Sequence, residues 1–139
     1  MTMMTDMEDA AFVQDYELLV IDDDLIQRTI IGKIGQQAGF RVVMAGTFED
    51  AADLLKSRRF DSLTLDLSLG EKSGALLLPI IAHLGYRLPV IVISGVEDHV
   101  LRATTEMSRI LSIETLPFSK PLNLVKLREA LLKQRDNAP

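Results

Sequence analysis

Short apolar runs alternate with amphipathic stretches along most of the chain. The runs are rich in leucine, isoleucine and valine, and they predict β-strands near residues 18–21, 41–44, 62–65, 90–93 and 113–118. Between the runs, apolar residues recur three or four positions apart, as they do on one face of a helix. Near-continuous apolar strands that alternate with helices are typical of a parallel sheet covered on both faces. We therefore expect one α/β domain with a doubly wound five-stranded sheet in the order 2-1-3-4-5.

Capping residues mark the starts of several helical stretches. Asp24, Thr47 and Asn123 each stand just before such a stretch, where a side-chain oxygen can accept a backbone N–H of the first turn. In the first stretch, isoleucines recur at helical spacing, and Gly32 and Gly35 lie among them. We interpret these two glycines as packing contacts, because they do not form a phosphate-binding loop.

Length and charge narrow the class of protein. The chain has 139 residues, of which 47% are hydrophobic and 25% are charged, and this suits one compact domain. We assign residues 17–134 to the domain, 1–16 to a flexible acidic N-terminal tail and 135–139 to a C-terminal tail. The net charge of −5 argues against a nucleic-acid partner, because such a partner needs a clustered basic face.

Composition also bears on location. The chain contains no cysteine, which excludes disulfides and thiolate metal sites. The longest apolar runs are far shorter than the roughly 18 residues of a membrane span, so we expect no membrane association. The first residues lack the apolar segment of a signal peptide. These features together favour a cytoplasmic protein.

Polar residues stand immediately after four of the five predicted strands. Asp22 and Asp23 follow the first strand, Asp66 the third, Ser94 the fourth and Lys120 the fifth. Ligands of open α/β sheets bind outside the carboxyl ends of the strands, where the strand order reverses. With the first and third strands adjacent, three carboxylates would share one pocket with a hydroxyl and an ammonium group.

Such a pocket predicts metal and phosphate chemistry. Three carboxylates at short range repel one another unless a cation neutralises them. Oxygen ligands favour Mg²⁺ or Mn²⁺. A cation and a lysine together leave room for a dianionic group, and phosphoryl is the natural candidate. Any one of these residues taken singly is better explained as a helix cap or a surface group, whereas the four strand ends together favour a functional site.

The sequence resembles a known family, the receiver domain of response regulators in bacterial two-component signalling. The resemblance covers residues 17–133 and implies a flavodoxin-like fold. It rests on an ordered set of motifs: the apolar run that ends in Asp22, Asp23 and Asp24, the run that ends at Asp66 with Gly74 beyond it, residues 89–95 with Ser94 and Gly95, and the pair Lys120 and Pro121.

The resemblance implies a metal-assisted phosphoacceptor. Asp66 would take a phosphoryl group from a sensor histidine kinase or a histidine phosphotransfer protein. Asp23 and Asp66 would ligate Mg²⁺ directly, Asp22 would help through water, and the backbone carbonyl of Ser68 would add a ligand. The chain would then be a signalling protein that catalyses only its own phosphorylation and dephosphorylation.

The resemblance also implies how the phosphoryl group is held and read. Ser94 would donate its hydroxyl to a phosphoryl oxygen, and Lys120 would pair with the group. The peptide bond between Lys120 and Pro121 is expected to be cis. The modified domain would switch a surface that binds an unidentified downstream protein, with a homodimer as a further possibility.

Three features depart from the family pattern. Pro117 stands three residues before the lysine, where the family usually has an aromatic switch residue. Phe118 has the strand parity of Lys120, so it does not simply replace that residue. Gly70 stands where the loop after the acceptor commonly has a proline, and the segment between Ser94 and Lys120 is longer than usual by about one helical turn.

Two alternatives stay open at the level of sequence. A haloacid-dehalogenase-like phosphatase would use Asp22 as the nucleophile and Asp24 as the acid/base, although the chain is short for that family. A degenerate receiver would serve only as a binding or dimerisation scaffold, and Pro117 leaves this interpretation open. Turnover of a phosphate ester would identify the first, and failure to accept phosphate from acetyl phosphate the second.

Overall fold

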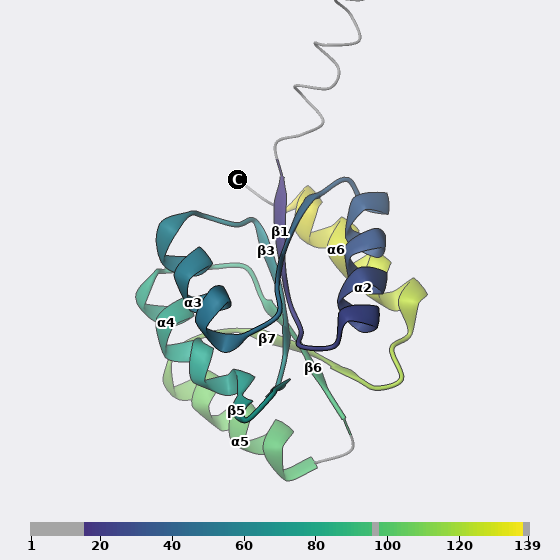
Figure 1. Ribbon diagram of the computed structural model, residues 1–139. Helices are drawn as coiled ribbons and strands as arrows, with labels where there is room; N and C mark the ends of the chain where they lie inside the picture. The colour runs from purple at the N-terminus through teal and green to yellow at the C-terminus, as the bar shows by residue number, and fades with distance from the viewer. Residues whose placement is uncertain (1–15, 96–97, 138–139) are drawn as a thin grey trace, which may run out of the picture.

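A parallel sheet forms the centre of the molecule, as seen edge-on in Figure 1. The computed structural model describes residues 16–95 and 98–137, without the side chains of residues 98 and 99. The sheet has five strands in the order β2-β1-β3-β6-β7, which confirms the predicted order. Its strands are β1 (Glu17–Ile21), β2 (Arg41–Ala45), β3 (Ser62–Asp66), β6 (Val90–Ser94) and β7 (Thr115–Ser119).

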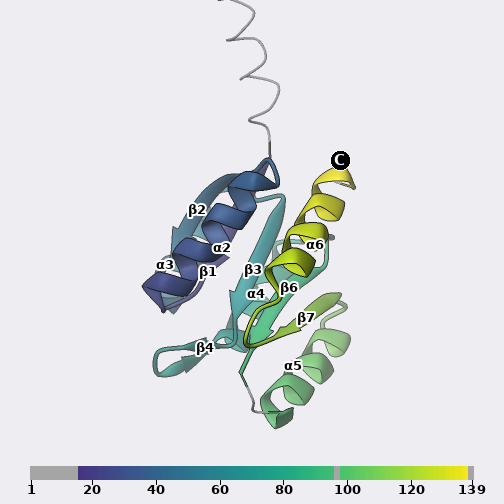
Figure 2. The same cartoon turned by 90° about the vertical axis from the view of Figure 1, so that its right-hand side faces the viewer.

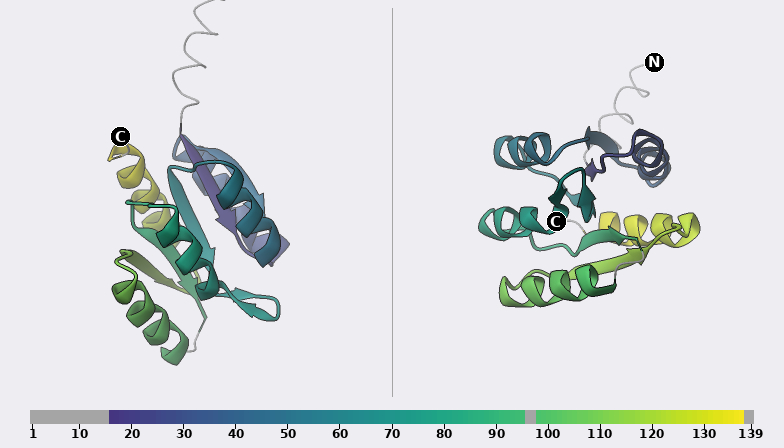
Figure 3. Two further views of the ribbon diagram at one scale, coloured as in Figure 1. Left: turned by 90° about the vertical axis from the view of Figure 1, so that its left-hand side faces the viewer. Right: turned by 60° about the horizontal axis from the view of Figure 1, so that its bottom comes forward.

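Helices cover both faces of this sheet, so the doubly wound prediction is also confirmed (Figures 1 and 3). One face carries α2 (Leu25–Gln37) and α6 (Leu124–Asp136), which lie in front of the sheet in Figure 2. The other face carries α3 (Phe48–Ser57), α4 (Leu78–His83) and α5 (Asp98–Ile110). Among the described residues, no helix combines the length and the apolar character that a membrane crossing requires.

The alternation of side chains along the strands divides the core into two clusters. Successive residues of a strand point to opposite faces. Leu19 and Ile21 of β1 therefore pack with the helices α3 and α4, whereas Leu18 and Val20 pack with α2 and α6. Every residue of β3 and β6 is buried, as expected for central strands of a sheet covered on both faces.

Helix α2 approaches the sheet through small residues. A Cβ atom on Gly32 would collide with the side chain of Met44, and one on Gly35 with that of Leu18. This confirms that the two glycines are packing contacts. Of the isoleucines at helical spacing, Ile34 packs against the core, whereas Ile26 is 72% exposed and Ile30 is 41% exposed. The exposed isoleucines begin at the end of α2 that lies nearest the carboxyl ends of the strands (Figure 1).

A small antiparallel hairpin follows β3, where the sequence predicts only a loop. It consists of β4 (Ser68–Leu69) and β5 (Lys72–Ser73), and a 3₁₀ helix, η1 (Gly74–Leu77), continues the chain. Gly70 in its turn has a φ of +61°, a conformation that glycine adopts without strain. Gly74 passes so close to the carbonyl oxygen of Asp66 that a Cβ atom there would collide with it. The hairpin is thereby held against the end of β3.

Several boundaries differ from the sequence prediction. The last strand begins at Thr115 instead of residue 113, because Ile113 still donates its N–H to Ser108 of α5 and Ser112 turns the chain with a φ of +60°. Helix α6 continues to Asp136, two residues beyond the expected end of the domain. The predicted N-terminal tail lies outside the described residues except for Tyr16.

Candidate functional site

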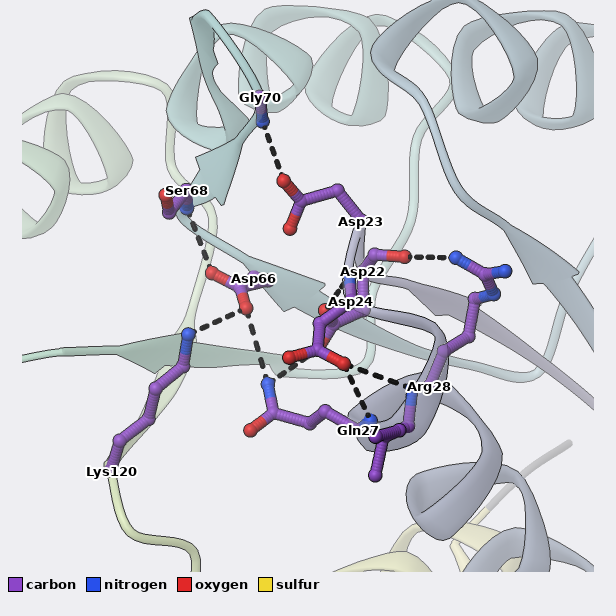
Figure 4. A network of polar contacts seen from close by, with 10 residues as sticks. Asp22, Asp23, Asp24, Gln27, Arg28, Asp66, Ser68, Gly70 and Lys120 are labelled. Atoms are coloured by element: carbon purple, nitrogen blue, oxygen red, sulfur yellow. Dashed lines mark hydrogen bonds and ion pairs between the residues drawn. The ribbon is translucent and has the colours of Figure 1, made fainter.

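The ends of β1 and β3 bring three carboxylates together (Figure 4). Ile21 pairs with Leu65 in the parallel register, so the residues that follow them, Asp22 and Asp66, lie side by side. Carboxylate oxygens of Asp22, Asp23 and Asp66 all lie within 4.8 Å of one another. Asp22 is 0% exposed and Asp66 is 1% exposed, whereas Asp23 faces solvent. The pocket thus has two buried acids and one accessible acid.

Both carboxylate oxygens of Asp66 have partners. The backbone N–H of Ser68 donates to Oδ1 at 2.8 Å, and Nζ of Lys120 lies 2.8 Å from Oδ2. Lys120 reaches the pocket from the end of β7, where its backbone N–H donates to the carbonyl oxygen of Ser94. Its peptide bond to Pro121 is cis, as predicted.

Charge neighbours set the proton affinity of Lys120. Partial burial by itself lowers the pKa of this ammonium group. The hydrogen bond and the charge of Asp66, together with the charges of Asp22 and Asp23, outweigh that effect, so the pKa of Lys120 is raised. The lysine is therefore held in its charged form beside the acids.

Asp22 is the most constrained acid of the three. Its Oδ1 accepts the backbone N–H of Asp24 at 2.9 Å, and its Oδ2 accepts a hydrogen bond from Nε2 of Gln27 at 2.5 Å. Burial raises the pKa of Asp22 and the nearby charge of Asp66 adds to the rise, although the two hydrogen bonds and Lys120 oppose it. A cation in the pocket would relieve this unfavourable charge.

Asp23 is oriented by the hairpin. Its Oδ2 accepts the backbone N–H of Gly70 at 2.9 Å, a contact that joins the loop after β1 to the turn between β4 and β5 (Figure 4). The hairpin is held in turn on its far side, where Lys72 forms an ion pair with Glu49 at 2.5 Å. The exposed acid of the pocket therefore has a defined direction.

Asp24 stands apart from the three clustered acids. Its Oδ1 accepts the backbone N–H groups of Ile26 and Gln27, which makes it the N-cap of α2, as the sequence predicts. The phosphatase interpretation needs this carboxylate as an acid/base partner of Asp22. Because Asp24 is engaged in capping the helix, the geometry does not favour that interpretation.

Ser94 lies on the other side of Asp66 from Asp22. It ends β6, one residue beyond Ile93, which is the register partner of Asp66. Ser94 is buried and contributes to the lining of a cavity of about 310 Å³ together with Leu67, Ser68 and Val100. The structure thus places the hydroxyl residue at the carboxyl edge of the sheet, as the strand order predicts.

Pro117 and Phe118 point to opposite faces of the sheet, as strand alternation requires. Phe118 is partly buried and packs against the cluster on the α2 and α6 face. Pro117 is exposed. The position that usually carries the aromatic switch residue is therefore a proline in this chain, and the ring of Phe118 lies on the opposite face of the sheet.

Sequence reasoning missed one member of the site, Gln27. Its Nε2 donates to Oδ2 of Asp22 and also to Oδ2 of Asp66, at 3.2 Å (Figure 4). Gln27 does not directly follow a strand, unlike the predicted site residues. Gln27 lies in the first turn of the helix that follows Asp22 and Asp23, and side chains in that turn can point back toward the strand ends. This position in the sequence could have identified it as a site residue.

The donor set fits a hard divalent cation. The pocket offers three carboxylates, and the ammonium group of Lys120 is the cation that pairs with them among the described residues. An oxygen-only set with an excess of negative charge is the environment in which Mg²⁺, Mn²⁺ or Ca²⁺ binds. The same cation and Lys120 could together stabilise an incoming phosphoryl group.

Comparison with known proteins agrees with this geometry. Residues 18–132 match the response regulator receiver domain family. The protein-glutamate methylesterase/protein-glutamine glutaminase of Clostridium acetobutylicum is 25% identical over 126 residues, which cover 88% of this chain and 36% of that protein. The transcriptional regulatory protein ZraR of Salmonella typhimurium is 26% identical over 117 residues, covering 84% of this chain and 26% of that protein. The chain spans about a third or less of these relatives.

A solved structure shows the same fold. The response regulator protein from Burkholderia pseudomallei, crystallised with a phosphorylated aspartic acid, a calcium ion and citrate, superposes with a TM-score of 0.69. The two chains are 23% identical, and the match covers 88% of this chain and 70% of that one. Because the family match extends over most of the chain, and the sheet order agrees with it, the chain belongs to the response regulator receiver domain family.

Proposed function

We propose that this receiver domain accepts a phosphoryl group on Asp66, with a Mg²⁺ or Mn²⁺ ion, in a two-component pathway. The observation that carries the proposal is the clustering of Asp22, Asp23 and Asp66 within 4.8 Å beside the ammonium group of Lys120. Two buried acids with a single lysine form a poor structural network but a suitable cradle for a cation and a phosphate.

The cation would be held by side chains from both sides of the pocket. Asp23 and Asp66 are the proposed direct ligands, with Asp22 acting through water and the backbone carbonyl of Ser68 as a further ligand. The N–H of Ser68 donates to Oδ1 of Asp66. Since the N–H and C=O of an extended residue point to the same strand edge, this supports a Ser68 carbonyl directed toward the pocket.

The proposed transfer moves phosphorus from nitrogen to oxygen. A carboxylate oxygen of Asp66 attacks the phosphorus of a phosphohistidine, the N–P bond breaks, and the imidazole leaves with the electron pair and takes up a proton. The bound cation would neutralise phosphoryl oxygens. Lys120 would turn from the Asp66 carboxylate to the new dianion, and Ser94 would donate its hydroxyl to it. The phosphorylated aspartic acid of the Burkholderia pseudomallei protein supports this product.

The surface beside the pocket suits a protein phosphodonor. Leu25 and Ile26 on α2 are exposed, and so are Leu124 and Val125 on α6. Ile26 and Leu124 together line a cavity of about 320 Å³ that also includes Gln27 of the acid site. A sensor histidine kinase or a histidine phosphotransfer protein would cover these apolar side chains while presenting its histidine to Asp66.

The phosphoryl group would act by changing a surface. It adds about two negative charges at the end of β3, which moves Lys120 from the Asp66 carboxylate to the phosphoryl group, draws Ser94 toward that group and biases the surface of α5 and β7 toward one conformer. An unidentified downstream protein or a second copy of the chain would read that surface. The two relatives named above are longer than the region that matches this chain, so an output activity encoded outside that region would agree with this proposal.

Incubation with acetyl phosphate tests the proposal. We expect a labile phosphoryl adduct by intact mass spectrometry when Mg²⁺ is present, and none when the metal is removed by EDTA. Absence of the adduct at saturating Mg²⁺ would support a scaffold without phosphoacceptor chemistry. Turnover of p-nitrophenyl phosphate would instead support the phosphatase alternative.

A further inference from the structure

We propose that Gln27 is a positioning residue that competes with the cation: its side-chain amide occupies acid oxygens that Mg²⁺ binding and phosphoryl transfer have to share. The inference rests on the proposed function of the acidic pocket and assigns a regulator of metal affinity within it. It begins from a contact that neither the strand-end motif nor the family match assigns, the bridge from Gln27 to Asp22 and Asp66.

The bridge uses both hydrogens of one NH₂ group. Nε2 of Gln27 lies 2.5 Å from Oδ2 of Asp22 and 3.2 Å from Oδ2 of Asp66. Figure 4 shows the side chain extending from the first turn of α2 across the opening between the two acids. Because both carboxylates are buried, these hydrogen bonds replace contacts with water that the acids have lost.

The base of the side chain is held in place by the helix start. The backbone N–H of Gln27 donates to the capping oxygen of Asp24, and α2 begins at Leu25. Asp24 in turn donates its own N–H to Asp22. The amide is therefore presented from the helix that follows Asp22 directly, and it reaches across to Asp66 at the end of β3.

Counting lone pairs shows why the bridge matters. A carboxylate offers about four acceptor positions, two on each oxygen. On Asp66, Oδ2 already accepts from Lys120 and from Gln27, and Oδ1 accepts from the N–H of Ser68. A phosphoacceptor needs one oxygen for the cation and the other for phosphorus. Once Lys120 turns to the phosphoryl group, Gln27 still occupies one acceptor position on Oδ2 of Asp66, so its amide competes with the cation and the phosphorus for this carboxylate.

The electrostatic consequence has a definite sign. The amide partly neutralises two carboxylates that otherwise repel each other, so it stabilises the metal-free pocket and leaves less repulsion for a cation to relieve. Removing the amide should raise the affinity for Mg²⁺. Hydrogen bonds to charged groups are among the stronger ones in proteins, and loss of this competition corresponds to a dissociation constant lower by about three- to tenfold.

Calorimetric titration with Mg²⁺ tests the competition directly. We compare the wild-type protein with Gln27→Leu, which keeps the side-chain volume and removes the amide. The matched control is Gln36→Leu, the same change at an exposed position of the same helix. We expect tighter Mg²⁺ binding for Gln27→Leu and an unchanged dissociation constant for Gln36→Leu. Unchanged or weaker binding by Gln27→Leu would overturn the inference, and weaker binding would identify the amide as a metal ligand.

A measurement on the wild-type protein removes the dependence on a variant that folds well. The side-chain NH₂ resonances of Gln27 in ¹H–¹⁵N spectra should shift on Mg²⁺ addition with the calorimetric dissociation constant, while those of Gln36 stay in place. Static Gln27 resonances during saturation would contradict the competition. A wild-type protein that binds no Mg²⁺ would overturn the proposed function as well, whereas normal wild-type binding with an unaffected Gln27→Leu variant would overturn this inference alone.

Discussion

The two ends of the central strands treat their charged side chains in opposite ways. At the amino end of β1, Glu17 forms ion pairs with Arg41 and Arg58, and its N–H donates to Asp61 at 2.7 Å. At the carboxyl end, three acids share one ammonium group, that of Lys120. The amino end is a neutralised network, whereas the carboxyl end keeps an excess of negative charge.

The same contrast holds for buried uncharged groups. At the amino end of β3, the hydroxyl of Ser62 donates to Oε1 of Gln134. Nε2 of Gln134 in turn donates to the carbonyl oxygen of Pro89 at 2.8 Å. Each polar atom of this network has its partner within the protein, so the network fastens α6 to the sheet. The amide of Gln27, by contrast, bridges groups that a ligand would claim. The hydrogen bonds of Gln134 therefore stabilise the fold, whereas those of Gln27 occupy acid oxygens that a bound cation would use.

The largest expected effect is a loss of phosphorylation on substitution at the carboxyl end of β3 but not at its amino end. Replacement of Asp66 by asparagine should abolish phosphorylation by acetyl phosphate, because the nucleophilic carboxylate is lost. The matched control is Asp61→Asn at the entrance to the same strand, which should accept phosphate at the wild-type level. Intact mass spectrometry measures both. A labile adduct on Asp66→Asn would refute the assignment of the acceptor.

Replacement of Lys120 should separate acceptance from response. Lys120→Ala keeps the three acids, so it should still form a beryllofluoride or phosphoryl adduct with Mg²⁺. Without the ammonium group, the charge at Asp66 should no longer draw β7 toward it. We expect backbone amide shifts in α5 and β7 for the wild type on beryllofluoride addition, and shifts confined to the pocket for the variant. Equal shifts in both proteins would show that Lys120 does not transmit the change.

Disruption of the amino-end network should cost stability and leave the metal site intact. Gln134→Leu fills the same space but removes the hydrogen-bond partner of the Ser62 hydroxyl and that of the Pro89 carbonyl. A buried polar group left without a partner lowers the free energy of unfolding by about 1–3 kcal/mol. Urea denaturation measures the loss, and calorimetry should give an unchanged affinity for Mg²⁺. A change in Mg²⁺ affinity would mean that the two ends of the sheet are coupled.

Neutralising one acid at each end of β1 should give effects of opposite sign. Asp22→Asn removes a buried charge from a repulsive cluster and should stabilise the metal-free protein by on the order of 1 kcal/mol. Glu17→Gln weakens partly exposed ion pairs and should destabilise it by about 0.5 kcal/mol. Denaturation at neutral pH without divalent metal measures both. The same sign for both variants would remove the contrast.

The pH dependence of Asp22→Asn sharpens this prediction. Because the pKa of Asp22 is raised in the folded protein, the wild type binds its proton more readily when folded than when unfolded. The wild type therefore gains stability relative to the variant as the pH falls through that raised pKa. The advantage of Asp22→Asn should be largest near neutral pH and should shrink in acid. Saturating Mg²⁺ should also reduce it, because the cation takes over the neutralisation.

The amino-acid pattern alone predicted the five strands of the main sheet, and the doubly wound order then predicted the three clustered acids. Apolar runs such as that of β6 have few alternatives to a buried parallel strand. Parallel strands also place all their carboxyl ends at one edge, so Asp22 and Asp66 had to meet once β1 and β3 were neighbours. Local propensity and strand alternation are short-range properties, and they can be read from the chain directly.

The contacts that surround those acids depend instead on how distant segments pack together. The hairpin after β3 depends on Gly74 passing against the carbonyl of Asp66 and on the N–H of Gly70 donating to Asp23, and the second of these contacts joins distant parts of the chain. The bridge of Gln27 depends on how α2 is rotated against the sheet, and the packing of Gly32 sets that rotation. Helical periodicity specifies that a helix has faces, whereas close packing with the sheet determines which face turns inward.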